Sequence, residues 1–235
     1  MSSNPARPQR PSAVLWDMDG TLVDTESYWM TAETALVREH GGEWTHEQAM
    51  QLVGNGLIDS GRILRDAGVD LEPAEIVDVL TDRVRGLLAR DGVPFRPGAR
   101  ELLLALRGAG IPTALVTMSL RRMAEDIVAL IDFPAFELIV AGDDVARPKP
   151  FPDAYLHAAS QLEIEPSRAL ALEDSPTGLR SALSAGTVAV GIPHIVPLDG
   201  CGAHELWATL KGRGVDDVVA AFDRHRTTGT DGSDR

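Results

Sequence analysis

Two aspartates separated by one residue, Asp17 and Asp19, follow a short apolar run at residues 13–16. Carboxylates this close repel each other unless a cation lies between them, and oxygen ligands of this kind suit Mg²⁺. Gly20 and Thr21 then turn the chain, and Thr21 offers hydroxyl and backbone donors to an anion. The pattern predicts a metal site beside an anion site, although so short a motif also occurs in plain polar turns.

Three further clusters carry groups that complement the two aspartates. They are Thr117 with Met118 and Ser119, then Lys149, then Glu173 with Asp174. A metal would take carboxylate oxygens from Asp17 and Asp174 and the backbone carbonyl of Asp19. Phosphoryl oxygens would accept hydrogen bonds from Thr117, the neighbouring backbone N–H groups and the Lys149 ammonium. An aspartate can attack phosphorus while a second carboxylate transfers the proton, so the four clusters together predict phosphoryl chemistry.

The elements that must position these clusters alternate between strand and helix after residue 97. We expect strands at residues 113–116, 136–140, 169–172 and 188–192, and helices at residues 98–109, 120–130, 152–161 and 177–185. With the first strand at residues 13–16, this alternation predicts an α/β fold with a doubly wound parallel sheet. The clusters then lie at strand carboxyl ends or in the loops beyond them, where ligands bind such sheets.

The segment that follows the first strand has apolar residues at helical spacing and no convincing strand. Helices are expected at residues 26–40, 46–52, 58–67 and 73–91. We therefore expect a core domain of residues 12–24 and 95–226, a helical cap domain of residues 25–94, and flexible tails at residues 1–11 and 227–235. A helical unit beside a ligand site can act as a lid, and Gly54 and Asn55 are the residues expected to reach the substrate.

Composition narrows the class of protein and its partners. The net charge of −13 at pH 7 argues against nucleic acid and anionic membranes, which need basic patches. No apolar run approaches the roughly 20 residues of a membrane span, and the polar, proline-containing start does not resemble a signal peptide. The single cysteine, Cys201, allows no internal disulfide. We expect a cytoplasmic monomer that acts on a small molecule.

The order of the motifs resembles the haloacid dehalogenase superfamily, in the subfamily with a helical cap after the first strand that includes phosphoglycolate phosphatases and β-phosphoglucomutase. The resemblance covers roughly residues 13–220, and its motifs are residues 17–21, 116–117, 149–150 and 173–178. It implies a Rossmann-like core, Mg²⁺ as cofactor, and a phosphoaspartyl intermediate formed on Asp17. It also implies that Asp19 is the general acid and base.

The same resemblance assigns the other site residues. Thr117 and Lys149 are expected to bind the phosphoryl group, together with Met118 and Ser119 in the same loop as Thr117, and Lys149 is also expected to hold the nucleophile. The expected metal ligands are Asp17, Asp19, Asp174 and Glu173. Met118 departs from the Asn or Ser that relatives often carry, which reduces the local polarity.

Within the superfamily, a second carboxylate at Asp19 favours phosphoryl chemistry over carbon–halogen cleavage. Residues 24–96 contain no lysine, so the cap lysine used by phosphonate-cleaving relatives and by sugar-phosphate mutases is missing. The prediction is a phosphatase acting on a small monoester such as a sugar phosphate. A mutase of the β-phosphoglucomutase type and a non-catalytic binding protein remain as alternatives.

Overall fold

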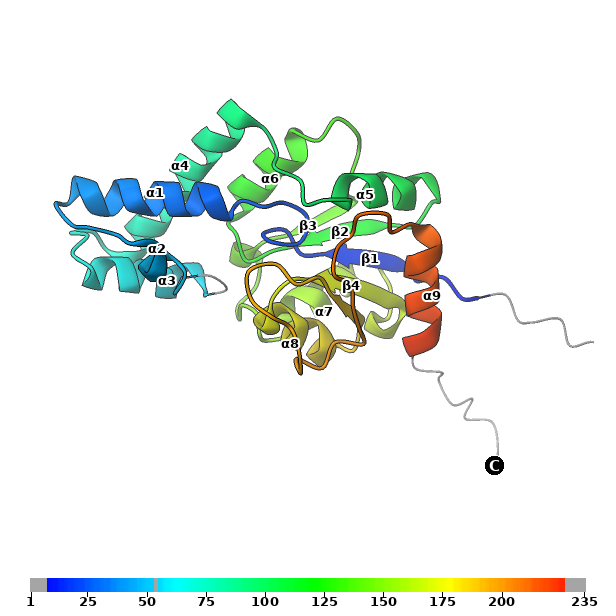
Figure 1. Ribbon diagram of the computed structural model, residues 1–235. Coiled ribbons are helices and arrows are strands. Elements are labelled where there is room, and N and C mark those ends of the chain that lie inside the picture. The colour runs from blue at the N-terminus through cyan, green and yellow to red at the C-terminus, as the bar shows by residue number, and fades with distance from the viewer. Residues whose placement is uncertain (1–7, 53–54, 227–235) are drawn as a thin grey trace, which may run out of the picture.

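A computed structural model describes residues 8–52 and 55–226 of the chain (Figure 1). Six parallel strands form one sheet in the order β3-β2-β1-β4-β5-β6. The strands are β1 (Ala13–Trp16), β2 (Thr113–Val116), β3 (Leu138–Val140), β4 (Ala169–Glu173), β5 (Val188–Gly191) and β6 (Glu205–Leu206). This is the predicted doubly wound α/β architecture, which the structure confirms.

Helices cover both faces of the sheet because each central strand is apolar on both sides. Val14 and Trp16 of β1 pack into one buried cluster, whereas Ala13 and Leu15 pack into the other. The first cluster is completed by α5 (Ala99–Gly108), α6 (Arg121–Ala129) and α9 (Val215–His225). The second is completed by α7 (Asp153–Gln161) and α8 (Pro176–Ala185). Two short 3₁₀ turns, Gly142–Asp144 and Pro166–Arg168, lie in the connections.

Four helices are inserted between β1 and α5 and lie beyond the carboxyl end of β1 (Figure 1). We call them the helical insert: α1 (Glu26–Glu39), α2 (His46–Ala49), α3 (Leu57–Asp66) and α4 (Pro73–Asp91). The two chain crossings that join the insert to the core run side by side. Val23 and Phe95 form an antiparallel bridge, and the Asp24 N–H donates to the Pro94 carbonyl at 2.7 Å.

Ion pairs also connect the insert to α6 of the core. Arg85 on α4 pairs with Asp126 at 2.5 Å, and Arg122 on α6 pairs with Asp78 at 2.7 Å. The two pairs have opposite polarity, since the insert supplies the cation in one and the anion in the other. Their side chains are exposed by more than a third in most cases, so salt screens them and each stabilises the contact only weakly.

Differences from the sequence-based expectation lie mainly at the end of the chain. β6 has two residues, too few to show an alternating pattern, and was not predicted. α9 was also missed, although Val215, Val218, Val219 and Phe222 follow the helical spacing of an apolar face. Residues 1–7 and 227–235, most of the two predicted tails, lie outside the described residues. Among the described residues, no helix is both long and apolar enough to cross a bilayer.

Candidate active site

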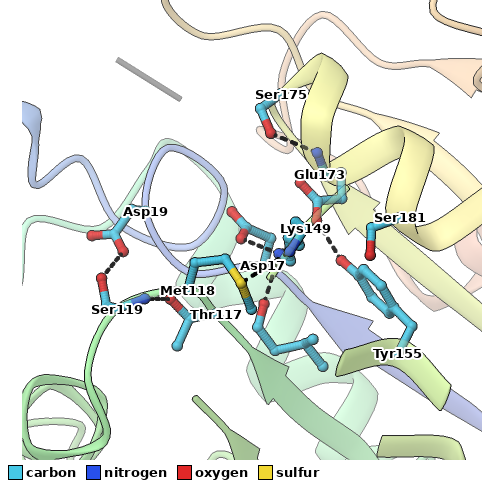
Figure 2. Close-up of polar contacts among 12 residues, drawn as sticks. Asp17, Asp19, Thr117, Met118, Ser119, Lys149, Tyr155, Glu173, Ser175 and Ser181 are labelled. Atoms are coloured by element: carbon cyan, nitrogen blue, oxygen red, sulfur yellow. Dashed lines mark hydrogen bonds and ion pairs between the residues drawn. The ribbon is translucent and has the colours of Figure 1, made fainter. Parts of the chain in front are cut away.

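The parallel register of three neighbouring strands brings the predicted clusters together at one edge of the sheet. Trp16 of β1 lies opposite Leu115 of β2 on one side and Leu172 of β4 on the other. Asp17 therefore emerges between Thr117, just beyond β2, and Glu173, the last residue of β4. Lys149 reaches the same point from the loop that follows β3. Figure 2 shows these side chains converging.

Lys149 joins two of the acidic groups at the centre of the site. Its Nζ donates to Asp17 Oδ1 and to Glu173 Oε1, each at 2.7 Å, and to the Val116 carbonyl at 2.9 Å (Figure 2). Burial lowers the pKa of Lys149, but the charges of Asp17 and Glu173 outweigh burial and raise it above its ordinary value. The lysine is therefore a fixed cation that offsets the repulsion between two buried carboxylates.

Glu173 is held by a second donor that the sequence did not reveal. The Tyr155 hydroxyl on α7 donates to Glu173 Oε1 at 2.5 Å, and both side chains are fully buried (Figure 2). Glycine at position 178 makes room for this carboxylate, since a Cβ there would lie 1.8 Å from Glu173 Oε2. In the sequence, Tyr155 is indistinguishable from a core aromatic, although a buried tyrosine hydroxyl needs a partner.

The acidic residues form a group that fits a divalent cation. Asp17, Glu173 and Asp174 each offer a carboxylate oxygen within 4.8 Å of the others. Within the described residues, Asp17 Oδ2 and Glu173 Oε2 are buried without any hydrogen-bond partner. Burial, and next the charge of Asp17, raise the pKa of Asp174 well above its ordinary value. Orphaned oxygens and crowded negative charge are what a hard cation with oxygen ligands would relieve.

The local backbone keeps Asp174 available for such a cation. Ser175, not Asp174, caps α8, since the Ser175 hydroxyl accepts a hydrogen bond from the Gly178 N–H at 3.0 Å. Gly20 has a φ of +85°, and a Cβ there would lie 2.0 Å from Asp174 Oδ2. A side chain at position 20 would therefore displace Asp174 from the group.

Asp19 lies apart from the group of three carboxylates and has a different environment. Its carboxylate accepts a hydrogen bond from the Thr25 hydroxyl. It accepts a second from the Ser119 hydroxyl at 2.7 Å (Figure 2). Burial raises the pKa of Asp19, while these two hydrogen bonds act in the opposite direction. Asp19 is thus disposed to hold a proton, whereas Asp17 is ion-paired with Lys149. Thr25 was not among the residues predicted for the site.

The loop after β2 is ordered by hydrogen bonds among its own residues. Thr117 Oγ1 accepts from the Ser119 N–H at 3.0 Å, so the Thr117 hydroxyl hydrogen stays available to an anion. Met118 Sδ accepts a hydrogen bond from the Lys149 N–H at 3.2 Å, which ties the loop to the lysine backbone (Figure 2). The Ser119 hydroxyl, expected to bind phosphate, instead donates to Asp19.

A cavity of about 360 Å³ extends from these groups to the underside of the helical insert. Asn55 lines it, and the Asn55 side chain donates to the Gln51 carbonyl at 2.8 Å. Gly54, the other residue expected to reach the substrate, lies outside the described residues. The insert also contributes Glu26, Trp29 and Glu33 to the wall. The two glutamates were missed because their positions in α1 read as an ordinary polar face.

His194, in the loop after β5, joins the cavity wall to the two chain crossings. Arg96 donates to His194 Nδ1, so Nε2 carries the hydrogen and donates to Asp24 Oδ1 at 3.1 Å. Arg96 also donates to the Pro193 carbonyl at 3.1 Å. One residue of each crossing is thereby fixed to the core beside the cavity.

Glu33 gives a prediction on stability because it is a nearly buried carboxylate. Burial raises its pKa from 4.5 to about 7, with the Trp44 hydrogen bond acting in the opposite direction. The unfolded chain therefore releases this proton first, and the folded state loses stability as pH rises from about 4.5 to about 7. Glu33→Gln removes this cost, so its free energy of unfolding should exceed that of the unmodified protein by up to about 3 kcal/mol at pH 8.

Urea unfolding at pH 8 and at pH 4.5 measures this difference. At pH 4.5 the two proteins should differ by only about 0.4 kcal/mol in free energy of unfolding, because Glu33 is then protonated in the folded state and only half ionised in the unfolded state. Glu43→Gln, at an exposed position, serves as the control and should change nothing at either pH. An equal gain at both pH values would contradict the ionisation argument.

Comparison with known proteins finds consistent matches in sequence and structure. The family model of haloacid dehalogenase-like hydrolases matches residues 11–186. Protein CbbY of Cereibacter sphaeroides is 36% identical over 185 residues, covering 74% of this chain and 80% of CbbY. Hexitol phosphatase A of Escherichia coli K12 is 35% identical over 193 residues, covering 80% of this chain and 87% of the phosphatase. The crystal structure of CbbY from Rhodobacter sphaeroides in complex with xylulose-(1,5)-bisphosphate matches with a TM-score of 0.80 and 31% sequence identity. The match covers 88% of this chain and 99% of the CbbY chain.

Proposed function

Since the chain belongs to the haloacid dehalogenase-like hydrolases, we propose that it is a Mg²⁺-dependent phosphatase acting on a small phosphate monoester, in the manner of its relative hexitol phosphatase A. The observation that carries the proposal is the contrast between the two aspartates after β1. Asp17 is paired with Lys149. Asp19, in contrast, is half-buried, accepts hydrogen bonds from Thr25 and Ser119, and has a pKa that desolvation raises. Two carboxylates with environments this different suit one nucleophile and one proton donor.

Asp17 is the nucleophile in this proposal. Its carboxylate attacks phosphorus and forms a phosphoaspartyl intermediate, which divides one difficult displacement into two easier ones. Lys149 fixes the attacking carboxylate and, with the Thr117 hydroxyl and neighbouring backbone N–H groups, binds the phosphoryl oxygens. The Thr117 hydroxyl hydrogen is in place before reaction, whereas the three Lys149 Nζ hydrogens are engaged by Asp17, Val116 and Glu173, so Lys149 acts on the phosphoryl group first through its charge.

Asp19 transfers the protons. In the first step its carboxyl group protonates the leaving alkoxide, and in the second its carboxylate takes a proton from the water that attacks the phosphoaspartate. The raised pKa of Asp19 favours the protonated form that the first step needs. Thr25 and Ser119 hold the carboxyl group in one orientation through both steps.

A bound Mg²⁺ would neutralise charge on the phosphoryl group. The residues that would hold it are Asp17 and Asp174, with the Asp19 backbone carbonyl and with Glu173 beside them. Glu173 already accepts from Lys149 and Tyr155 through Oε1, so only Oε2 is free to face a cation.

We propose further that residues 25–94 act as a cap domain over a core of residues 12–24 and 95–226. The cavity walls come from both parts, so closure of the cap would exclude water from the reaction. The described residues of a single chain supply every proposed role, which supports catalysis by the monomer. The mutase alternative is disfavoured, because the described cavity residues of the insert include no lysine or arginine to grip a second phosphate.

Phosphate release from a panel of monoesters and diesters, with and without Mg²⁺, tests this function. Removing metal with EDTA should lower kcat by at least about 100-fold, because a bound metal contributes several kcal/mol to transition-state stabilisation. Adding Mg²⁺ back should restore the rate. Metal-independent release, or release from diesters alone, would contradict the proposal.

Asp19→Asn should separate the proton donor from the nucleophile. We expect kcat for an alkyl phosphate to fall about 100-fold, because the alkoxide must then leave without a proton. With p-nitrophenyl phosphate, whose leaving group needs no proton, the first step should be affected much less. Pre-steady-state measurement of p-nitrophenol release provides the comparison, and equal losses for both substrates would exclude Asp19 as the acid.

A further inference from the structure

The wall of the cavity under the helical insert carries two acidic side chains, Glu26 and Glu33. They are seven residues apart on α1 and therefore lie on the same face of that helix. Burial, and next the charges of Glu33, Asp19 and Asp24, together raise the pKa of Glu26 from 4.5 to about 7. Above about pH 7, where they are ionised, the two glutamates continue the negative field of the core carboxylates into the space that a leaving group would occupy.

Glu33 has an unused hydrogen-bond acceptor in this space. Only 5% of the residue is exposed, and its Oε2 accepts from Trp44 Nε1 at 3.3 Å. Its Oε1 accepts no hydrogen bond from any described residue and is not among the fully buried oxygens, so it keeps exposed surface on a residue that lines the cavity. A ligand with hydroxyl or ammonium groups would supply a donor to this oxygen.

The cavity has no uncommitted cation for a second anionic group. Its basic lining residues, among those described, are Lys149 and His194. Lys149 is engaged by Asp17 and Glu173, and His194 lies between Arg96 and Asp24. Residues 53 and 54, outside the described part, are Val and Gly and carry no charge. A phosphate dianion under the insert would therefore face two carboxylates with no countercharge.

We propose that the cavity under the insert selects a leaving group rich in hydroxyl or ammonium donors and rejects one that carries a second phosphate, with Glu26 and Glu33 as the residues that discriminate. This inference rests on the proposed function, because it concerns the leaving group of the same phosphate ester. The preferred substrate class is a singly phosphorylated polyol or amino-polyol. The apolar surface of Leu57, Val77 and Leu80 beside the glutamates can cover the carbon skeleton of such a compound.

Three ligands with the same ring and a shared phosphate position test the inference. Glucose 6-phosphate, glucosamine 6-phosphate and glucose 1,6-bisphosphate are titrated by calorimetry into the full-length Asp17→Asn protein with Mg²⁺. The titrations are done at pH 8, where Glu26 and Glu33 are mostly ionised, and the substitution prevents turnover. We expect the Kd of the bisphosphate to be at least about tenfold above that of glucose 6-phosphate. The aminosugar should bind at least as tightly as glucose 6-phosphate. Equal or tighter binding of the bisphosphate would overturn the inference.

Removing the charges of Glu26 and Glu33 should reduce the preference of the cavity for glucose 6-phosphate over glucose 1,6-bisphosphate. In the Asp17→Asn protein, we expect the double substitution Glu26→Gln and Glu33→Gln to lower the ratio of the bisphosphate Kd to the glucose 6-phosphate Kd by about tenfold. The control substitution Glu43→Gln should leave this ratio unchanged. Glu33→Gln alone, which is expected to stabilise the fold, provides the measurement if the double variant does not fold. A ratio that neither variant changes would show that the glutamates do not discriminate.

Hydrolysis of acetyl phosphate by the unmodified protein separates this inference from the proposed function. Acetyl phosphate is too short to depend on the insert and reports the phosphoryl site alone. Turnover of acetyl phosphate without the expected order of Kd values would retain the phosphatase and overturn the inference. The expected order without any turnover would retain the inference about ligand class and overturn the phosphatase.

Discussion

Replacing Asp17 with asparagine should reduce kcat by about 10⁵-fold or more while the protein remains folded. The amide is a poor nucleophile, and loss of the nucleophile in an enzyme that forms a covalent intermediate removes most of the catalysis. The fold should survive because the amide oxygen can still accept from Lys149 Nζ, and Glu173 still supplies a countercharge. Steady-state phosphate release and the circular dichroism spectrum measure the two effects.

Asp199→Asn is the matched control for this substitution. Asp199 is exposed and forms no hydrogen bond within the described residues, so its replacement should change neither kcat nor the thermal midpoint. A variant at position 17 that keeps more than about 1% of kcat would exclude Asp17 as the nucleophile. Full loss of activity together with loss of the native spectrum would show a structural effect instead.

Lys149→Met should reduce both activity and stability. Two carboxylates would lose their buried cation, and breaking one side of a buried ion pair costs about 3–5 kcal/mol. The phosphoryl group would also lose a positively charged donor, which corresponds to a decrease in kcat of about 10²- to 10³-fold. Chemical unfolding and phosphate release measure the two losses separately.

The chain offers a close control for this variant, since Lys211 is its only other lysine and is exposed. Lys211→Met should leave both quantities unchanged. Adding Glu173→Gln to Lys149→Met should recover part of the lost stability but not the activity, because it removes one uncompensated charge without restoring the donor. No recovery of stability in the double variant would show that charge balance is not what Lys149 contributes to the fold.

The predicted fold rested on signals that are local in the chain. The five apolar runs and the helical spacing between them indicate a parallel sheet, and parallel pairing brings the residues after β1, β2 and β4 to one edge. The convergence of Asp17, Thr117, Lys149 and Glu173 could therefore be predicted without coordinates. β6 could not, because two residues added to a sheet edge carry no periodic pattern.

The sequence could not reveal the hydrogen-bond partners that influence the protonation of each site carboxylate. Tyr155 lies on α7 and reaches Glu173 across 18 positions of the chain, and Ser119 reaches Asp19 across 100. Such pairs depend on how helices and loops dock, which no local spacing encodes. The acidic wall formed by Glu26 and Glu33 was hidden for the same reason, since a charged helical face usually lies in solvent.

The paired chain crossings at Val23 and Phe95 affect how the protein can evolve. The bridge between them closes the core at the point where the insert leaves it, so the ends of the insert are fixed next to each other. The entropy of closing such a loop grows only with the logarithm of its length, about 0.6 kcal/mol for each doubling. Inserts of different length or shape could therefore be exchanged at this position with little effect on the core. Under the proposed function, substrate preference and catalytic chemistry would be encoded in separable segments of the gene, and recombination could alter the first without disturbing the second.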